Sequence, residues 1–399
     1  MEALDALREA LSGELEGNIL PYWLDKVRVR DGWGHHGWVG MNGRIRARAP
    51  RGGVLHARIL WAYSAAARTL ERPDLADAAR SAFRDLSDHF HDREYGGFYW
   101  MLDAKGRVID DRKQVYAQAF AVYALSEYAA LSGDAEALAL ARETFGLVRR
   151  HAVDPVHGGY LEARDRQWGP TRENRLSGRD MDSPKSMNTH LHVLEAWTCL
   201  FRVDASPAVR EALSETYDWM RAHIVDDAES RMQLFFGMDW TKASDTTSFG
   251  HDIEGSWLLH EAAEVLGDPV RLADARALAV RMADKVLEKG LDQEYGGLFN
   301  EIANGRLKTE KIWWVQAEAL VGFFNAWQIS GEHRFLDAAM NLWRFIDSHI
   351  VDHAGGEWFW ETDRKGRPLH GRPKVEPWKC PYHNARACLE MMRRLGARD

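Results

Sequence analysis

Cysteine is scarce in this sequence, and its distribution excludes two kinds of stabilised fold. Three cysteines occur among 399 residues, Cys199, Cys380 and Cys388, and none of them forms a CxxC pair. An odd number of scattered cysteines argues against a disulfide framework and against a zinc ribbon. Free thiols are typical of a reducing compartment, so we expect a cytoplasmic protein.

The sequence also lacks a long apolar run and an excess of basic charge. No apolar segment approaches the roughly 18 residues that a membrane-spanning helix needs. Residues 1–17 have the pattern of an amphipathic helix rather than of a signal peptide. Asp and Glu number 60 against 52 Lys and Arg, a formal net charge of −8. We therefore expect no membrane segment and no nucleic-acid partner.

Two further features are missing, a phosphate-binding loop and an interdomain linker. The glycine pairs of this sequence precede residues with strand periodicity, whereas a phosphate-binding loop leads into the N-terminus of a helix. We expect no nucleotide cofactor, and no cofactor of another kind. Since no segment rich in proline, glycine and serine divides the chain, we expect one catalytic domain over residues 1–399.

Aromatic residues, in contrast, are abundant: 17 Trp, 15 Phe and 11 Tyr. They exceed what the core of a globular chain of this size requires, so some of the rings are expected to face a ligand.

One pattern recurs along the chain: a glycine pair or near-pair, alternating aromatic residues, and a turn such as Lys-Gly or Asn-Gly. The alternation has the period of a strand, and glycine at the turn supplies the positive φ of a tight hairpin. The copies occupy residues 34–44, 94–107, 156–166, 294–306 and 354–367, with a weaker copy at 232–240. A spacing of about 60 to 70 residues predicts a repeat architecture with one short hairpin per repeat.

Between the hairpins the sequence has helical periodicity, twice in each interval. Residues 114–128 are apolar nearly all round, as in a helix buried on both sides. A single apolar stripe follows, formed by Leu138, Ala141, Phe145 and Val148. Each repeat is therefore expected to hold an inner helix and an outer helix.

The two ends of the chain complete this pattern. The helix expected within residues 1–20 carries Leu4, Leu7, Leu11 and Leu15 on one face, and the last inner helix, about residues 381–395, lacks a following partner. Pairing the two closes a ring of twelve helices. The predicted fold class is all-α, an (α/α)6 barrel with short β-hairpins at the active-site mouth. Residues 161–185, rich in Arg and Asp, are expected to form a long surface loop near that mouth.

Six side chains recur near one position of the repeat, in the first turns of the inner helices: Arg58, Tyr116, His192, His251, Trp314 and His383. In a closed ring these positions face one cavity, together with Glu254. A single His in an apolar helix is more often a hydrogen-bonded core residue than a catalyst. Three of them at equivalent positions indicate a catalytic cavity.

The pair His190 and His192 could indicate a metal site on a strand. On a helix the two rings point about 200° apart, so one faces the cavity and the other packs outside it. We select His192, which lies one turn after Asn188. His251 and Glu254 share a helix face but lack a second His and a second carboxylate, so we predict no metal site.

Several stretches resemble those of the cellobiose 2-epimerases, which belong to the N-acylglucosamine 2-epimerase superfamily of (α/α)6 barrels. The most specific are residues 185–196, KSMNTHLHVLEA, and residues 378–384, WKCPYHN. Shorter ones are residues 57–61, 115–118, 249–254 and 313–318. The resemblance covers essentially the whole chain.

This resemblance implies a role for each candidate residue. His251 and His383 would be the acid and base, and His192 would lie beside O1 and O5 of the sugar and help to open its ring. The remaining residues would bind the substrate: Arg58, Tyr116, Asp180, Asn188, Glu254, Trp314 and Trp378. The implied enzyme is an isomerase that interconverts the reducing-end glucose and mannose of cellobiose and lactose, as a monomer or weak homodimer without a cofactor.

The chemistry fits these residue types. Epimerisation at C2 removes a proton next to the aldehyde and returns one to the opposite face, so it needs two bases. Imidazole suits both, because its pKa of about 6.5 lets one ring be neutral and the other protonated. Arg58 and a protonated His192 would stabilise the negative charge of the enediolate.

Two other functions remain open. An enzyme acting on a monosaccharide, such as a mannose isomerase, a mannose 2-epimerase or an N-acylglucosamine 2-epimerase, would use nearly the same histidines. An inverting glycosidase would need two carboxylates roughly 6.5–9.5 Å apart, and the sequence offers only Glu254 in a suitable place. A purely carbohydrate-binding role would leave the three histidines unexplained.

Overall fold

The computed structural model describes residues 2–178 and 180–396, which contain twelve α-helices. Contacts between residues divide the chain into two compact units. Unit 1 comprises Met1–Ala47, Thr246–His260 and Ala273–Asp399, and unit 2 comprises Arg48–Asp245 and Glu261–Leu272. The single domain expected from the sequence stays a prediction. Within the described residues, no helix is both long enough and apolar enough to cross a membrane.

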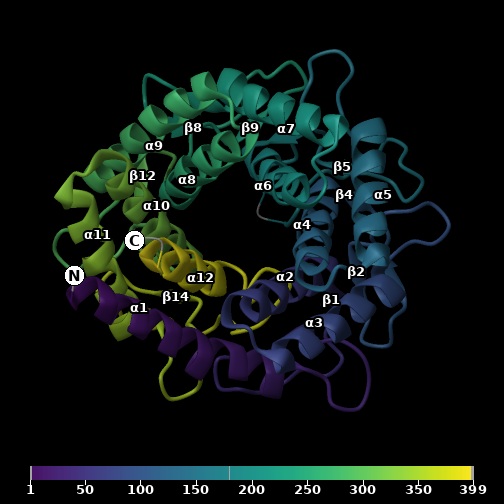
Figure 1. Ribbon diagram of the computed structural model, residues 1–399, viewed down its shortest axis with the longest axis horizontal. Coiled ribbons are helices and arrows are strands. Elements are labelled where there is room, and N and C mark those ends of the chain that lie inside the picture. The colour runs from purple at the N-terminus through teal and green to yellow at the C-terminus, as the bar shows by residue number, and fades with distance from the viewer. Residues whose placement is uncertain (1, 179, 397–399) are drawn as a thin grey trace. The chain divides into compact units, whose positions relative to one another are not determined.

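Unit 2 is built from pairs of helices in two layers (Figure 1). Its helices are α2 (Gly53–Leu70), α3 (Pro73–Asp85), α4 (Val115–Ser132), α5 (Ala135–His151), α6 (Met187–Val203) and α7 (Pro207–Trp219). Helices α2, α4 and α6 lie side by side, and α3, α5 and α7 cover them. Short π-helical segments, η3 (Leu86–Phe90) and η4 (Met220–Ile224), extend α3 and α7.

Unit 1 holds both ends of the chain. Its helical segments are α1 (Glu2–Glu14), η1 (Leu15–Ile19), η2 (Tyr22–Val27), α10 (Trp313–Ser330), α11 (His333–Phe345), η5 (Ile346–Ile350) and α12 (His383–Gly396). Two more helices, α8 (Phe249–Leu266) and α9 (Pro269–Lys289), contribute residues to both units. Helix α10 packs against α11 and α12, and α12 packs against α1 (Figure 1).

The helix layers follow from the sequence pattern. All residues of α4 from Val115 to Tyr128 are buried, as predicted for a helix apolar on every side. In α5 a single stripe is buried, which includes Ala141, Phe145 and Val148. Leu138, expected in that stripe, is only half-buried. Gly133 ends α4 with a φ of 68°, and the Asp134 carboxylate accepts the N–H groups of Glu136 and Ala137 to begin α5.

The strands are only two or three residues long, and their pairing joins the start of a buried helix to a hairpin. Strand β11 (Glu301–Ala303) forms a regular hairpin with β12 (Arg306–Lys308), and β2 (Met101–Leu102) forms one with β3 (Val108–Asp110) in which the register shifts between Met101 and Leu102. The other strands are β1 (Arg51–Gly52), β4 (Lys113–Gln114), β5 (Ala163–Arg164), β6 (Lys185–Ser186), β7 (Val225–Asp226), β8 (Arg231–Met232), β9 (Phe235–Phe236), β10 (Thr247–Ser248), β13 (Lys311–Ile312) and β14 (Glu361–Thr362). The strand before a buried helix pairs with the strand of the next hairpin, as β4 does with β5 and β13 with β14.

The N-terminal helix packs beside the last helix, as the sequence predicts. Leu7 and Leu11 are buried, but Leu4, expected to be buried with them, is only half-buried because it lies near the start of α1. The Glu14 carboxylate accepts hydrogen bonds from Nε1 of Trp358 and Nδ2 of Asn18, both at 2.7 Å. Burial raises the pKa of Glu14 to about 7. The contact between α1 and the last hairpin is therefore sensitive to the ionisation of Glu14.

We expect Glu14→Gln to become more stable relative to the parent protein as the pH rises. The unfolded chain releases this proton near pH 4.5 and the folded chain near pH 7, so Glu14 destabilises the fold increasingly over that interval. The amide keeps an oxygen for Trp358 and carries no charge. Urea unfolding at about pH 5 and about pH 8 should show a change in the stability difference of up to about 3 kcal/mol. The control is Glu9→Gln, at an exposed position of the same helix; an equal difference at both pH values would contradict the expectation.

Candidate active site

The predicted site residues are divided between the two units. His251, Glu254, Trp314, Trp378 and His383 belong to unit 1, and Arg58, Tyr116, Asp180, Asn188 and His192 belong to unit 2.

In unit 1, His383 is held by a carboxylate. The imidazole stands at the first residue of α12 and is 6% exposed. Its Nδ1 lies 2.6 Å from Oε1 of Glu318 on α10. Because an ionised carboxylate only accepts hydrogen bonds, this contact assigns the proton of the neutral ring to Nδ1 and makes Nε2 its basic nitrogen.

Arg386, one turn after His383, joins two buried carboxylates. Its Nη2 donates to Oε1 of Glu254 at 2.5 Å and to Oε1 of Glu318 at 2.7 Å. Nε1 of Trp257 donates to the other oxygen of Glu318 at 3.2 Å. Glu254, Glu318 and His383 offer ligand atoms within 4.8 Å of one another, a grouping that could hold a metal ion. The guanidinium, however, already supplies positive charge where the two carboxylates meet.

His251 and His383 both lie against the ring of Trp314. The ring centres are 4.7 Å apart for His251 and 5.5 Å apart for His383. Nδ1 of His251 lies 2.8 Å from the Ser248 hydroxyl, just before α8. The structure therefore brings together two imidazoles and one half-buried indole. Trp378 is half-buried in the segment that precedes α12.

In unit 2, Arg58, Tyr116 and His192 are in contact and nearly fully buried. Nη2 of Arg58 donates to the Tyr116 hydroxyl at 2.6 Å, and the guanidinium lies 4.1 Å from the ring centre of Phe120. The His192 ring packs on Tyr116 and Phe120, with centres 5.0 and 4.7 Å apart. Nδ1 of His192 lies 3.0 Å from Oε2 of Glu195, so a carboxylate also orients this imidazole.

Asn188 and Asp180 lie near the start of α6. The side-chain oxygen of Asn188 is buried and has no hydrogen-bond partner within the described part of the chain, which costs free energy unless a ligand or water satisfies it. Asp180 accepts a hydrogen bond from the Ser177 hydroxyl at 2.7 Å. Burial, with a smaller effect of the Asp180 charge, raises the pKa of Glu162 to about 7. Glu162 accepts a hydrogen bond of 2.8 Å from the hydroxyl of Thr189, the residue after Asn188.

His190 has a different task from His192. Its Nδ1 donates to the carbonyl of Ser186 at 2.7 Å, and its Nε2 accepts the N–H of Tyr160 at 2.8 Å. Burial lowers the pKa of His190 to about 4. The ring is therefore a neutral clamp on the hairpin at 156–166. Gln118 and Gln316 occupy the equivalent place in their repeats and bind the backbone of Phe98 and Leu298.

We expect His190→Gln to be tolerated and His190→Leu to be destabilising. The glutamine oxygen can accept the Tyr160 N–H as Gln118 accepts that of Phe98, whereas leucine leaves a buried donor unpaired, at a cost of about 1–3 kcal/mol. Urea unfolding of the two variants measures the difference. Equal stability of the leucine and glutamine variants would show that the clamp does not matter.

The sequence analysis missed Glu318, Arg386, Glu195 and Ser248. The repeat offered a signal for one of them: Glu318 follows Trp314 by four residues, as His192 follows Asn188. The repeat gave no signal for the others, because the roles of Arg386, Glu195 and Ser248 depend on partners that only the folded structure shows.

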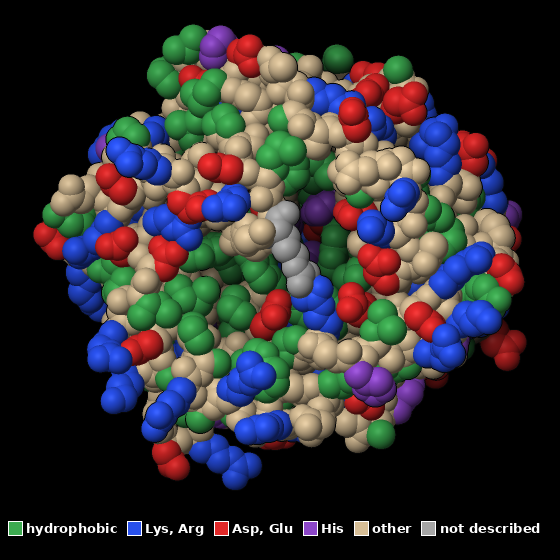
Figure 2. Space-filling view, turned by 180° about the vertical axis from the view of Figure 1, so that it is seen from behind, with side chains coloured by type: hydrophobic (Ala, Val, Ile, Leu, Met, Phe, Trp, Pro, Cys, Tyr) green, Lys and Arg blue, Asp and Glu red, His purple; other side chains and the backbone are tan. Residues whose placement is uncertain are grey.

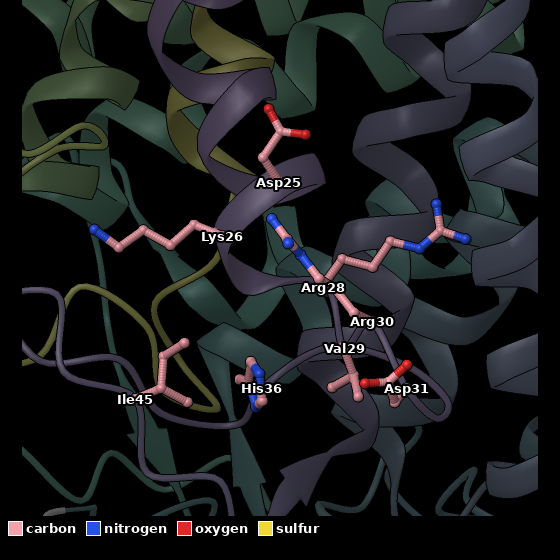
Figure 3. A pocket seen from close by; sticks show the side chains of 8 residues that line it. All are labelled: Asp25, Lys26, Arg28, Val29, Arg30, Asp31, His36 and Ile45. Atoms are coloured by element: carbon pink, nitrogen blue, oxygen red, sulfur yellow. The ribbon is translucent and has the colours of Figure 1, made fainter.

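A separate pocket of about 490 Å³ lies at the end of η2 in unit 1 (Figure 3). Its lining is Asp25, Lys26, Arg28, Val29, Arg30, Asp31, His36 and Ile45. None of the predicted site residues lines it. Acidic and basic side chains are also interspersed across the face drawn in Figure 2, so charge by itself does not mark this pocket as the place of the chemistry.

Comparison with known proteins gives a consistent result. The family model described as N-acylglucosamine 2-epimerase (GlcNAc 2-epimerase) matches residues 34–387. The chain is 39% identical to cellobiose 2-epimerase of Bacteroides fragilis over 97% of this chain and 99% of that one. The cellobiose 2-epimerase structure from Spirochaeta thermophila is 41% identical, with a TM-score of 0.92 over 99% and 98% of the chains. D-mannose isomerase of Marinomonas mediterranea is 23% identical over 76% of this chain and 77% of that one.

These likenesses confirm the predicted fold class, an all-α barrel with short hairpins. They also account for the motifs in residues 185–196 and 378–384, which lie within the region matched by the family model.

Proposed function

Because the chain belongs to the N-acylglucosamine 2-epimerase family, we propose that it is an isomerase that interconverts the reducing-end glucose and mannose of β-1,4-linked disaccharides. Cellobiose would give 4-O-β-glucosyl-mannose, and lactose would give epilactose. The observation that carries this proposal is the pair of imidazoles, His251 and His383, both of which pack against the Trp314 ring.

The reaction requires an open-chain sugar, a base that removes the proton at C2, and an acid that returns a proton to the opposite face. We assign these two proton transfers to His251 and His383, each of which is oriented at Nδ1 by a neighbouring oxygen. Glu318 holds His383 through a hydrogen bond, and Arg386 in turn donates to Glu318 and Glu254. Trp314 and Trp378 would cover the apolar face of a pyranose ring.

The negative charge that forms on O1 and O2 needs donors. We assign this role to Arg58 and to His192 in its protonated form, with Tyr116 and Asn188 as further hydrogen-bonding groups. Arg58 and His192 are nearly fully buried, and preorganised donors are most effective where water is excluded. No electron leaves the substrate in this scheme, so the reaction does not call for a redox cofactor.

A glycosidase is the less supported alternative. Glu318 is a second carboxylate beside Glu254, but both carboxylates accept a hydrogen bond from the same Nη2 of Arg386. Both are 1% exposed, and the shared guanidinium favours their ionised form. Neither is therefore suited to protonate a leaving group, as the glycosidase mechanism needs.

A monosaccharide epimerase or isomerase is the closer alternative. The identity of 39% to a cellobiose 2-epimerase, against 23% to a D-mannose isomerase, favours the disaccharide. The substrate is in either case a small carbohydrate. A cytoplasmic location and a monomeric or weakly dimeric state stay predictions.

Replacing His251 or His383 by Asn should abolish epimerisation and leave the fold intact. Asparagine keeps some hydrogen bonding but cannot move a proton near neutral pH, and positioned proton transfer contributes about 10²–10⁴ in rate. We expect kcat on cellobiose to fall at least about 100-fold. Incubation in heavy water with NMR detection of deuterium at C2 measures both proton transfers. A variant with near-normal exchange and turnover would remove that residue from the assignment.

Asp180→Ala should affect a disaccharide more than a monosaccharide, if Asp180 contacts the outer sugar. The loss of one hydrogen bond to a hydroxyl corresponds to about 1 kcal/mol, so kcat/KM for cellobiose should fall several-fold, while that for mannose should stay unchanged. Asp182→Ala, an exposed carboxylate of the same loop, is the control. Equal losses on the two sugars would favour the monosaccharide alternative.

A further inference from the structure

The last hairpin contains a glutamate where three other hairpins have glycine. Glu357 has a φ of 63°, and the equivalent residues Gly97, Gly159 and Gly297 have φ values of 69°, 78° and 72°. In all four repeats the carbonyl of this residue accepts an N–H from an aspartate, Asp352 in the case of Glu357. A left-handed backbone is strained for glutamate, and such strain persists only where other interactions maintain it.

The Glu357 side chain is completely buried and accepts four hydrogen bonds. Nε1 of Trp23 donates to Oε2 at 2.5 Å. Three donors converge on Oε1: Nζ of Lys379 at 2.8 Å, Nδ2 of Asn384 at 2.7 Å and the N–H of Trp358 at 2.9 Å. Lys379 is also fully buried, so the pair is a buried ion pair.

Two of these donors lie on either side of His383. Lys379 precedes it by four residues, and Asn384 follows it directly. In other repeats a long side chain of the buried helix binds the hairpin backbone directly, as Gln316 binds Leu298. Asn384 is shorter than glutamine by one methylene group, and the Glu357 carboxylate bridges Asn384 to the N–H of Trp358.

We propose that Glu357 is a positioning residue for the reaction, which fixes the segment Lys379–Asn384 and thereby holds His383 against Glu318 and Trp314. This inference rests on the proposed function, in which His383 transfers a proton. It explains why a strained glutamate stands at a glycine position. It also gives a role to Lys379 and Asn384 of the stretch WKCPYHN, whose side chains donate hydrogen bonds to Glu357.

The test compares two double variants, Glu357→Gly with Lys379→Met and Glu357→Gln with Lys379→Met. Lys379→Met removes the buried cation in both, so that no unpaired charge is left. Glycine restores the residue of the other repeats and deletes the acceptor, whereas glutamine keeps an oxygen for Asn384 and Trp358. We expect the glycine variant to lose at least tenfold in kcat on cellobiose with KM within twofold, and the glutamine variant to recover most of that loss.

A purely structural role would give another result. The control is Asp352→Asn with Lys374→Met, which removes a buried ion pair of the same hairpin that contacts neither Lys379 nor Asn384. This control should lower the unfolding midpoint and leave kcat of the folded enzyme unchanged. If the glycine variant is folded with wild-type kcat, or if the control loses kcat to the same extent, the proposal is overturned.

Asn384→Ala keeps the test decisive if the glycine variant does not fold, because it removes the hydrogen bonds of Asn384 to Glu357 and to the Ala385 N–H but leaves the Glu357–Lys379 ion pair in place. It should lower kcat without raising KM, and a normal kcat would overturn the proposal. A parent protein that exchanges no deuterium at C2 of cellobiose, lactose or mannose would instead refute the proposed function itself. The two failures are therefore distinguishable.

Discussion

An ion pair between a buried lysine and an aspartate, repeated four times, holds hairpins to the chain segments that follow them. The pairs are Lys113–Asp92 and Lys185–Asp154 in unit 2, and Lys311–Asp292 and Lys374–Asp352 in unit 1. The lysine side chains are at most 1% exposed. Burial alone would raise the pKa of Asp292, but hydrogen bonds from Arg364 and Lys311 lower it to about 2. Because taking two charges out of water is costly, the value of such a pair lies in the geometry that it fixes. Lys113, Lys185 and Lys311 lie in strands directly before α4, α6 and α10, so these three pairs fix the first turns of the helices that carry Tyr116, His192 and Trp314. Lys374 lies outside such a strand, nine residues before α12.

The repeat explains why neighbouring residues of one helix have different tasks. In α6, His190 clamps the preceding hairpin, and His192 contacts Arg58's partner Tyr116. In α10, Gln316 clamps a hairpin and Glu318 binds His383. Two residues along a helix correspond to about 200° of rotation, so the clamp and the site residue point to nearly opposite sides. Each repeat can therefore vary its chemistry at one position without disturbing the contact that holds its hairpin.

The same separation accounts for what the sequence could predict. Hairpin turns and helix periods are local, so the repeat, the helix order and the choice of His192 over His190 followed from spacing. The spacing offered a signal for Glu318 but none for Arg386, because the role of Arg386 depends on an ion pair between α10 and α12. Nor could the sequence pattern show that Glu357 takes the left-handed conformation that glycine takes in other hairpins, because that φ is a property of the folded backbone. Leu4 is only half-buried because it lies near the end of α1. A stripe of apolar residues in the sequence does not show where the packed part of a helix ends.

The two imidazoles of unit 1 differ in the partners of their Nδ1 atoms. His383 contacts an ionised carboxylate, Glu318, which shares Arg386 with Glu254. With a neutral His383 the formal charges of these four side chains sum to −1, and a proton on His383 brings the sum to zero. His251 contacts the neutral hydroxyl of Ser248. A carboxylate stabilises an imidazolium more than a hydroxyl does. A two-base epimerisation needs one ring that is protonated while the other is neutral, and the carboxylate beside His383 favours a proton on that ring more than the Ser248 hydroxyl favours one on His251.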